Sequence, residues 1–226
     1  MNVIDGIKIA FENLRNLRFF VSEADFQHSL AIELQKTFKD TAQIILEFPI
    51  KLPDEKRIIH IDIMIIKDGK YYPIELKYKT HKIQSNQFYN NTQIQISELL
   101  TNHSGNDDNC YHIWADMARI EWLVNTNQVE YGVCIFITNQ QSFWCGKSNP
   151  DSMAYAFRTS SGLKSAGWHR WKHIKTNISS KHILDKPDLF IHNDYNFQWD
   201  DFYDTGDKYG LFKSLFIEIS PKNKKD

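Results

Sequence analysis

The sequence contains little cysteine, proline or glycine, and it has no long apolar run. Its 226 residues include 3 cysteines, 6 prolines and 9 glycines. Cys110, Cys134 and Cys145 form no CxxC pair and leave one cysteine over, which excludes a disulfide-framed miniprotein and favours a reduced, cytoplasmic setting. No stretch approaches the roughly 18 consecutive apolar residues of a membrane span. The first residues also lack the basic-then-apolar order of a signal peptide.

The chain has almost no net charge. Its 27 basic and 28 acidic side chains give a formal charge of -1, which argues against nucleic-acid binding through bulk electrostatics. The charge is nevertheless uneven along the chain. Residues 152–184 carry six basic residues and no acid, whereas residues 185–207 carry seven Asp and the single base Lys186. Local charge is therefore more informative than the total.

Several motifs of common enzyme classes are missing. The sequence has no GxSxG, P-loop, dinucleotide fingerprint or HExxH, so serine-hydrolase, NTPase, dehydrogenase and zincin functions lose support. Its composition, 42% hydrophobic, 14% aromatic and 24% charged, is that of a globular protein. Without repeats or low-complexity linkers, we expect one domain spanning 1–226.

Hydrophobic periodicity predicts a mixed α/β domain with a central sheet flanked by helices. A helix is expected over 22–38, with Ser22 as its N-cap and an apolar stripe at four-residue spacing. Strands are expected at 44–52, 57–66, 71–78 and 129–138, a second helix at 110–125, and a closing strand at 211–219. The remaining C-terminal residues suggest loops and short strands.

A hairpin is the most informative local feature. Asp68-Gly69 between two apolar-rich runs predicts a two-residue type I′ turn, in which Lys67 pairs with Lys70. Counting back from this turn, Asp62 faces Glu75 and His60 faces Lys77. Strand alternation then places these four side chains on one face of the hairpin. The opposite face is apolar and is expected to be the core side; it carries Ile59, Ile61, Ile63, Ile65, Tyr72, Ile74, Leu76 and Tyr78.

The paired acids Asp62 and Glu75 call for a counter-charge. Directly opposed residues lie about 5 Å apart at Cβ, where two carboxylates repel each other. A divalent cation removes that penalty, because Mg²⁺ uses one or two carboxylates and keeps waters for a phosphate substrate. Lys77 would then lie beside the metal, where an ammonium orients or helps deprotonate water, or offsets charge on phosphate. The alternative is an ordinary solvent-exposed hairpin face.

A third acid is predicted on the first helix. On a helical wheel Glu23 falls within the apolar stripe of helix 22–38, so it needs a polar partner, which the metal site would supply. The alternative is an acid that interacts with the helix dipole.

These residues resemble the PD-(D/E)XK nuclease superfamily: Glu23 on a first helix, Asp62 in Ile61-Asp62-Ile63, and Glu75-Leu76-Lys77 on the adjoining strand. The resemblance covers the first 80 or so residues and extends to helix 116–121 and strand 132–138. It implies a restriction-endonuclease-like core over about 20–140 with a β-rich C-terminal extension over about 141–226. One departure is Ile61, which stands where many members have proline.

The resemblance also implies roles for these residues. Asp62, Glu75 and the backbone carbonyl of Leu76 would hold Mg²⁺, for which Mn²⁺ would substitute. Lys77 would position the hydrolytic water, and Glu23 would assist. The implied activity is hydrolysis of phosphodiester bonds, with DNA as the substrate; a homodimer would supply the two sites that cutting both strands needs.

A basic, tryptophan-containing segment is the candidate nucleic-acid contact. Cations contact phosphates and indoles stack on bases, which points to Lys164, Trp168, Arg170, Trp171 and Lys172. The alternative is that the tryptophans pack in a C-terminal subdomain. Gln84, Gln87 and Gln93 are expected at the surface, and Asp116 and Arg119, which lie off the apolar stripe of their helix, are expected to form a surface pair or a subdomain contact.

Two other function classes stay open on the sequence alone. One is a non-catalytic module that keeps the nuclease fold to bind nucleic acid or serve as an assembly scaffold, although such a role needs neither the paired acids nor Lys77. The other is a metal-free enzyme such as a retaining glycosidase, which uses two carboxylates about 5 Å apart. That mechanism leaves Lys77 and Glu23 without a task.

Overall fold

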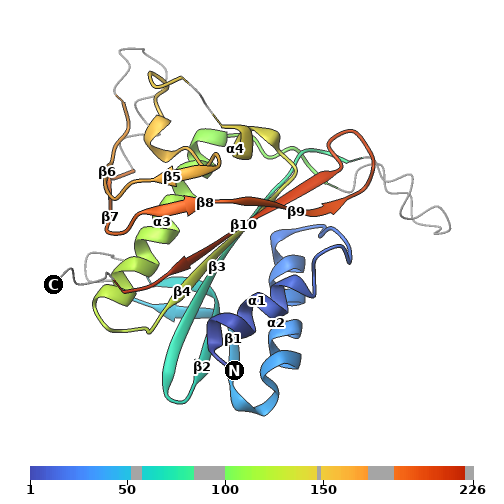
Figure 1. Ribbon diagram of the computed structural model, residues 1–226, viewed down its shortest axis with the longest axis vertical. Helices are drawn as coiled ribbons and strands as arrows, with labels where there is room; N and C mark the ends of the chain where they lie inside the picture. The colour runs from blue at the N-terminus through green and yellow to red at the C-terminus, as the bar shows by residue number, and fades with distance from the viewer. Residues whose placement is uncertain (52–57, 84–99, 147–148, 173–185, 222–226) are drawn as a thin grey trace.

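A mixed six-stranded β-sheet forms the centre of the protein (Figure 1). The computed structural model describes residues 1–51, 58–83, 100–146, 149–172 and 186–221. The strand order is β1-β2-β3-β4-β10-β9; β3 and β4 run parallel, and the other neighbours are antiparallel. The strands are β1 (Gln43–Ile50), β2 (Ile59–Lys67), β3 (Lys70–Lys79), β4 (Gly132–Thr138), β9 (Trp199–Asp204) and β10 (Leu211–Ile219). The predicted class, α/β with a mixed central sheet flanked by helices, is confirmed.

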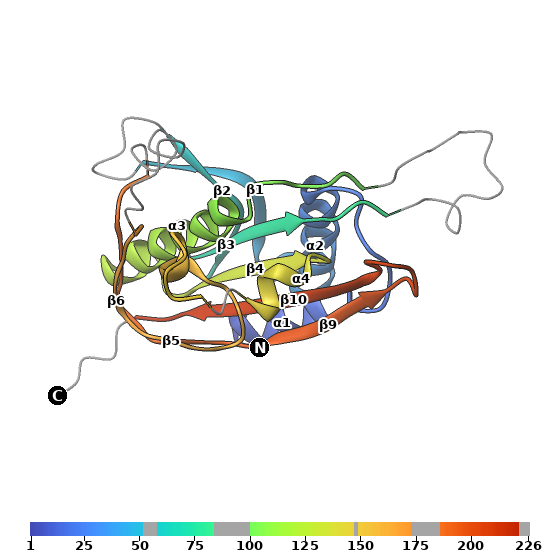
Figure 2. The same cartoon turned by 90° about the horizontal axis from the view of Figure 1, so that it is seen from above.

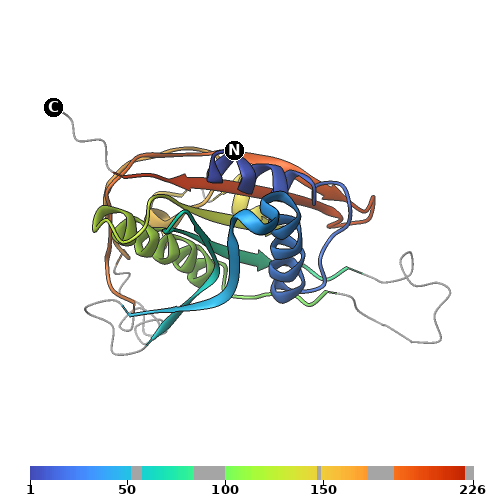
Figure 3. The same ribbon diagram turned by 90° about the horizontal axis from the view of Figure 1, so that it is seen from below.

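Helices cover both faces of this sheet. Helices α1 (Val3–Glu12) and α2 (Glu23–Phe38) pack on one face, and α3 (Asn106–Asn125) packs on the other. Figures 2 and 3 show α2 and α3 on the two sides of β3 and β4. The shorter helices are η1 (Lys39–Thr41), α4 (Gln141–Cys145) and η2 (Tyr155–Phe157). Within the described ranges, no helix combines the length and apolar character that crossing a membrane requires.

Helix α2 forms where the sequence predicts it. The Ser22 side chain accepts a hydrogen bond from the backbone N–H of Asp25, which satisfies one of the free donors at the helix start. Its predicted apolar stripe is buried against the sheet: Phe26, Leu30, Leu34 and Phe38. Helix α1 was not predicted. Asn2 caps it in the same way, and it adds a second apolar stripe to the same core.

The β2–β3 hairpin has the predicted turn. Asp68 and Gly69 both adopt left-handed backbone conformations, with φ of 53° and 74°, as a type I′ turn requires. The predicted register holds from Lys67–Lys70 to Ile63–Ile74. The paired register thus ends one residue short of the predicted Asp62–Glu75 pair.

The C-terminal part of the chain completes the central sheet. Strand β10 pairs with β4 and with β9, so the sheet core extends beyond the predicted limits of about 20–140 at its C-terminal end, as α1 extends it at the other. Two small two-stranded sheets pack over α3. They are formed by β5 (Gly162–Lys164) with β8 (Tyr195–Phe197), and β6 (Gly167–His169) with β7 (Leu189–Ile191).

Candidate active site

Strands β2 and β3 diverge at Asp62. Their backbone pairing ends at Ile63–Ile74, and the next contact is made by a side chain: Asp62 Oδ2 accepts a hydrogen bond of 2.6 Å from the backbone N–H of Leu76. The carboxylate thus takes the place that a β2 carbonyl would occupy in a regular ladder. The predicted pairing of His60 with Lys77 does not form between the described strands; His60 pairs with Pro49 of β1 and is exposed.

The neighbouring strand β1 is distorted at the same level. Glu47 has a left-handed backbone, with φ of 51°, and the β1–β2 register omits the Glu47–Asp62 pair. Beyond this point the strand faces exchange: Ile63 packs with the α2 side, whereas Ile61 packs with the α3 side. The prediction that Ile61 and Ile63 share one face is therefore wrong. Gln27 of α2 bridges the distortion, donating to Glu47 Oε1 and to the carbonyl of Asp62, both at 2.7 Å.

Glu75 and Lys77 project from β3 toward α3. Glu75 is 3% exposed, and its Oε1 forms an ion pair with Arg119 Nη1. Lys77 Nζ lies 2.7 Å from Asp116 Oδ2 and also donates to the carbonyl of Leu76 at 3.1 Å. Asp116 and Arg119 are joined to each other at 3.2 Å. Two charged residues of one strand are thus matched by two of the facing helix.

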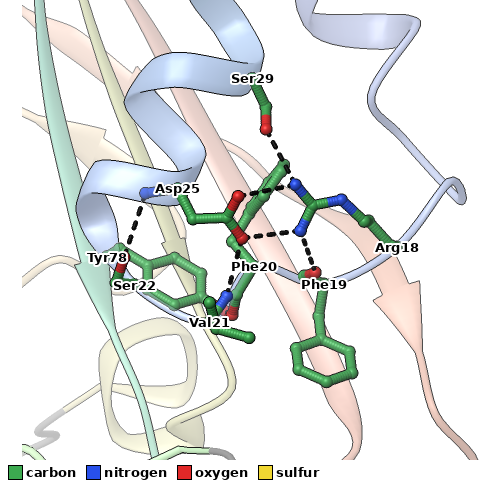
Figure 4. Close-up of polar contacts among 8 residues, drawn as sticks. All are labelled: Arg18, Phe19, Phe20, Val21, Ser22, Asp25, Ser29 and Tyr78. Atoms are coloured by element: carbon green, nitrogen blue, oxygen red, sulfur yellow. Dashed lines mark hydrogen bonds and ion pairs between the residues drawn. The ribbon is translucent and has the colours of Figure 1, made fainter. Parts of the chain in front are cut away.

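The start of α2 brings Glu23 to the same place. Glu23 Oε2 accepts a hydrogen bond of 2.8 Å from the backbone N–H of Tyr78, the residue after Lys77. The loop before α2 is fixed by a salt bridge, at 2.7 Å, between Arg18 and Asp25, whose carboxylate also accepts from the Val21 N–H (Figure 4). The Tyr78 hydroxyl donates to the carbonyl of Phe20, which ties the loop to β3.

The four predicted catalytic residues, Glu23, Asp62, Glu75 and Lys77, are therefore gathered at one point. Asp62 lies close enough to Glu75 for the two to interact electrostatically, and Glu23 does the same with both Asp62 and Lys77. Leu76, whose carbonyl is the third predicted ligand, lies between Glu75 and Lys77 on β3. Hairpin register predicted that Asp62, Glu75 and Lys77 share a face, and the helical wheel added Glu23, by a simpler geometry than the diverging strands that the structure has.

Burial sets the protonation of this cluster. It raises the pKa of Glu75 well above its usual range, and the nearby Asp116 charge raises it further. Burial likewise raises the pKa of Asp62, against the opposing charge of Lys77. Burial alone would lower the pKa of Lys77, but the charges of Asp116, Glu75 and Glu23 outweigh it and raise that pKa. Lys77 is an ammonium at neutral pH, which suits orienting water or offsetting charge better than removing a proton.

The donor set suits a hard divalent cation. No cluster of three or more His, Cys, Asp and Glu side chains poised to hold a metal exists in the described part of the chain. Mg²⁺ does not need one, because one or two carboxylates with several waters suffice. Asp62 and Glu75 supply the two carboxylates; burial raises the pKa of both, and Glu75 also pairs with Arg119. The residues present therefore fit such an ion.

Known proteins offer no identification of this site. No family model, no curated protein and no solved structure matches the chain. The function is therefore inferred from the residues of the site and their geometry.

Sequence reasoning missed part of the cluster. The sequence predicts a surface pair or a subdomain contact for Asp116 and Arg119, but Asp116 is 6% exposed and Arg119 reaches Glu75 in the site itself. The sequence did contain a signal for this arrangement. Asp116 and Arg119 lie three residues apart on the helix and are opposite in charge to Lys77 and Glu75 on the strand, with which they pair. Gln27 and Glu47 carried no such signal. Gln84, Gln87 and Gln93 lie outside the residues that the structure describes.

The basic tryptophan segment is only partly at the surface. Trp168 is 58% exposed, and the Arg170 guanidinium lies 5.0 Å from its ring centre while pairing with Asp188 at 3.0 Å. Lys172 pairs weakly with Asp151 at 3.5 Å. Lys164 and Trp171 are buried, at 4% and 6% exposed, so they are corrected from predicted surface contacts to packing residues. Their apolar surroundings on the α3 side account for this.

Buried Lys164 should make stability depend on pH. Burial lowers the pKa of Lys164 to about 8, below the unfolded value of about 10.5. The protonated form is therefore disfavoured in the folded state; this penalty is complete below pH 8 and disappears as pH rises to about 10.5. We expect Lys164→Met to raise Tm by about 2–4 °C at pH 7, the effect of ~1 kcal/mol, and by less at pH 10.

The control for this comparison is Lys208→Met, at an exposed position. Its Tm difference from wild type should be the same at both pH values. A Lys164→Met difference that does not shrink at pH 10 would contradict the assignment.

Proposed function

We propose that this chain is a metal-dependent nuclease with a restriction-endonuclease-like core, which hydrolyses phosphodiester bonds of DNA with Mg²⁺ as its cofactor. The observation that supports it best is the convergence of Glu23, Asp62, Glu75 and Lys77 where β2 and β3 diverge. Two neighbouring carboxylates beside a partly buried ammonium are costly to keep in a core, so a role in binding or catalysis is the economical explanation.

The proposed mechanism assigns each residue a task. Asp62, Glu75 and the Leu76 carbonyl would hold the ion, and a bound Mg²⁺ would polarise the scissile phosphate and favour deprotonation of water. Lys77, held by Asp116 at 2.7 Å, offers its ammonium to the attacking water or to the phosphate oxygens. Glu23 fixes the backbone of Tyr78 and so the position of Lys77 on β3.

The alternative is a catalytically inactive nuclease-fold module that binds nucleic acid or serves as an assembly scaffold. The Arg119–Glu75 ion pair favours it, because a protein cation already compensates one of the two acids. Calorimetric titration with Mn²⁺ separates the two: binding that depends on Glu75 supports the nuclease, and its absence supports the scaffold.

Cleavage assays test the proposal. Wild type, Asp62→Asn and Glu75→Gln are incubated with plasmid and with single-stranded DNA, in Mg²⁺, Mn²⁺ or EDTA. We expect metal-dependent cleavage by wild type and at least about a 100-fold loss in both variants. Glu130→Gln, at a partly exposed acid before β4 that pairs with Lys70 of the hairpin, is the matched control and should retain activity. Activity that survives in both site variants would refute the proposal.

A further inference from the structure

Each group proposed to hold the metal already accepts a hydrogen bond from the chain. Glu75 Oε1 takes the Arg119 guanidinium, the Leu76 carbonyl takes Lys77 Nζ, and Asp62 Oδ2 takes the backbone N–H of Leu76. The first two donors are cations. A divalent ion entering here must therefore displace or approach positive charge, and Arg119 occupies an oxygen of Glu75 that the ion could use.

Arg119 can leave Glu75 without losing its other partner. Its Nη2 lies 3.2 Å from Asp116 Oδ1, three residues back on the same helix. The guanidinium side chain retains 23% exposure, whereas the Glu75 side chain retains 3%, so Arg119 is the more accessible partner of the pair. A planar guanidinium also binds phosphate oxygens in the same forked manner as carboxylates.

We propose that Arg119 is a latch on Glu75 that competes with divalent metal and is drawn off by the phosphate of the substrate. The inference rests on the proposed nuclease function. Without DNA, the latch keeps the affinity for metal low. A phosphodiester that takes over the guanidinium leaves Glu75 free to bind the ion, so that substrate and metal strengthen each other's binding by the same factor.

Calorimetry with Mn²⁺ tests the latch directly. We expect Arg119→Gln to bind Mn²⁺ about tenfold more tightly than wild type, because competition and like-charge repulsion are both removed. Arg119→Lys keeps the charge and should remain within about threefold of wild type. The matched control is Arg158→Gln, whose guanidinium stacks on Tyr155 rather than pairing with an acid of the site. It should bind Mn²⁺ as wild type does.

A cleavage-resistant phosphorothioate oligonucleotide provides the second arm. It should tighten Mn²⁺ binding to wild type by about tenfold and change binding to Arg119→Gln by less than about threefold. Thermal unfolding checks the folded state of the variants. In EDTA, Arg119→Gln should melt below wild type because Glu75 loses its cation, and saturating Mn²⁺ should raise its Tm by more than it raises that of wild type.

Three outcomes would overturn the latch: weaker or equal Mn²⁺ binding by Arg119→Gln, an oligonucleotide effect that persists in this variant, or no Mn²⁺ binding by either protein. Cleavage is scored separately. Wild type that cleaves DNA while Arg119→Gln binds Mn²⁺ no more tightly refutes the latch and leaves the nuclease standing. If Arg119→Gln binds Mn²⁺ more tightly but wild type does not cleave DNA, the nuclease function is refuted and the competition between Arg119 and metal is retained.

Discussion

Replacing Lys77 by methionine is expected to lower the rate of metal-dependent DNA cleavage by about 10²–10⁴-fold, the range typical of removing a positioned proton-transfer or charge-stabilising group. The ammonium of Lys77 donates to the Leu76 carbonyl and pairs with Asp116. It also interacts electrostatically with the carboxylates of Asp62, Glu75 and Glu23. Methionine keeps the apolar stem but has no charge. Single-turnover cleavage of an end-labelled duplex measures the loss.

The controls separate catalysis from folding. Lys77→Met removes one of the two cations that pair with the buried Asp116, so circular dichroism and thermal unfolding must show that the variant is folded at the assay temperature. Lys77→Arg restores the charge with a different shape and should recover only part of the rate. Lys70→Met, at an exposed position of the same hairpin, should cleave as wild type does. A Lys77→Met rate within about threefold of wild type would exclude the assigned role.

Replacing Glu121 by alanine is expected to cause the largest loss of stability, about 3–5 kcal/mol, or roughly 10 °C in Tm. Glu121 of α3 is fully buried and accepts hydrogen bonds from the backbone N–H groups of His192 and Asn193 and from the Tyr195 hydroxyl, at 2.7, 3.0 and 2.6 Å. Alanine would leave the buried Tyr195 hydroxyl and two part-buried backbone N–H groups without this acceptor. Urea and thermal unfolding measure the effect.

This single carboxylate connects α3 to the β7–β8 segment more than 70 residues later, and so ties the C-terminal part of the chain to the core. Tyr195→Phe removes one of the three bonds and should cost about 1 kcal/mol. Glu130→Ala, at a partly exposed position, should stay within about 0.5 kcal/mol of wild type. A cost below about 1 kcal/mol for Glu121→Ala would mean that other packing holds this segment in place.

Most of the secondary structure can be predicted from local signals in the sequence. The Asp68-Gly69 turn fixed the register of β2 and β3, and the Ser22 cap and apolar stripe located α2. The closing strand at 211–219 was placed correctly as β10. Helix α1 had comparable signals, an Asn2 cap and apolar residues at helical spacing, and could have been predicted from them.

The features that sequence reasoning missed depend on tertiary contacts. Alternation cannot anticipate that Ile61 changes face, because the change follows from the left-handed backbone of Glu47 on a neighbouring strand. The burial of Asp116 depends on Lys77 facing it from β3. Trp171 and Lys164 are likewise buried by elements far away in the sequence. Hairpin register predicted the grouping of Asp62, Glu75 and Lys77, and the helical wheel added Glu23, but the partners Asp116 and Arg119 come from the facing helix.

The most direct test of the central claim is to locate the metal. A crystal of the protein grown with Mn²⁺ is measured at a wavelength where manganese scatters anomalously. We expect an anomalous peak about 2.0–2.4 Å from carboxylate oxygens of Asp62 and Glu75 and near the Leu76 carbonyl. Crystals of Asp62→Asn should lack this peak. No peak at these groups, or a peak elsewhere on a protein that cleaves DNA, would contradict it.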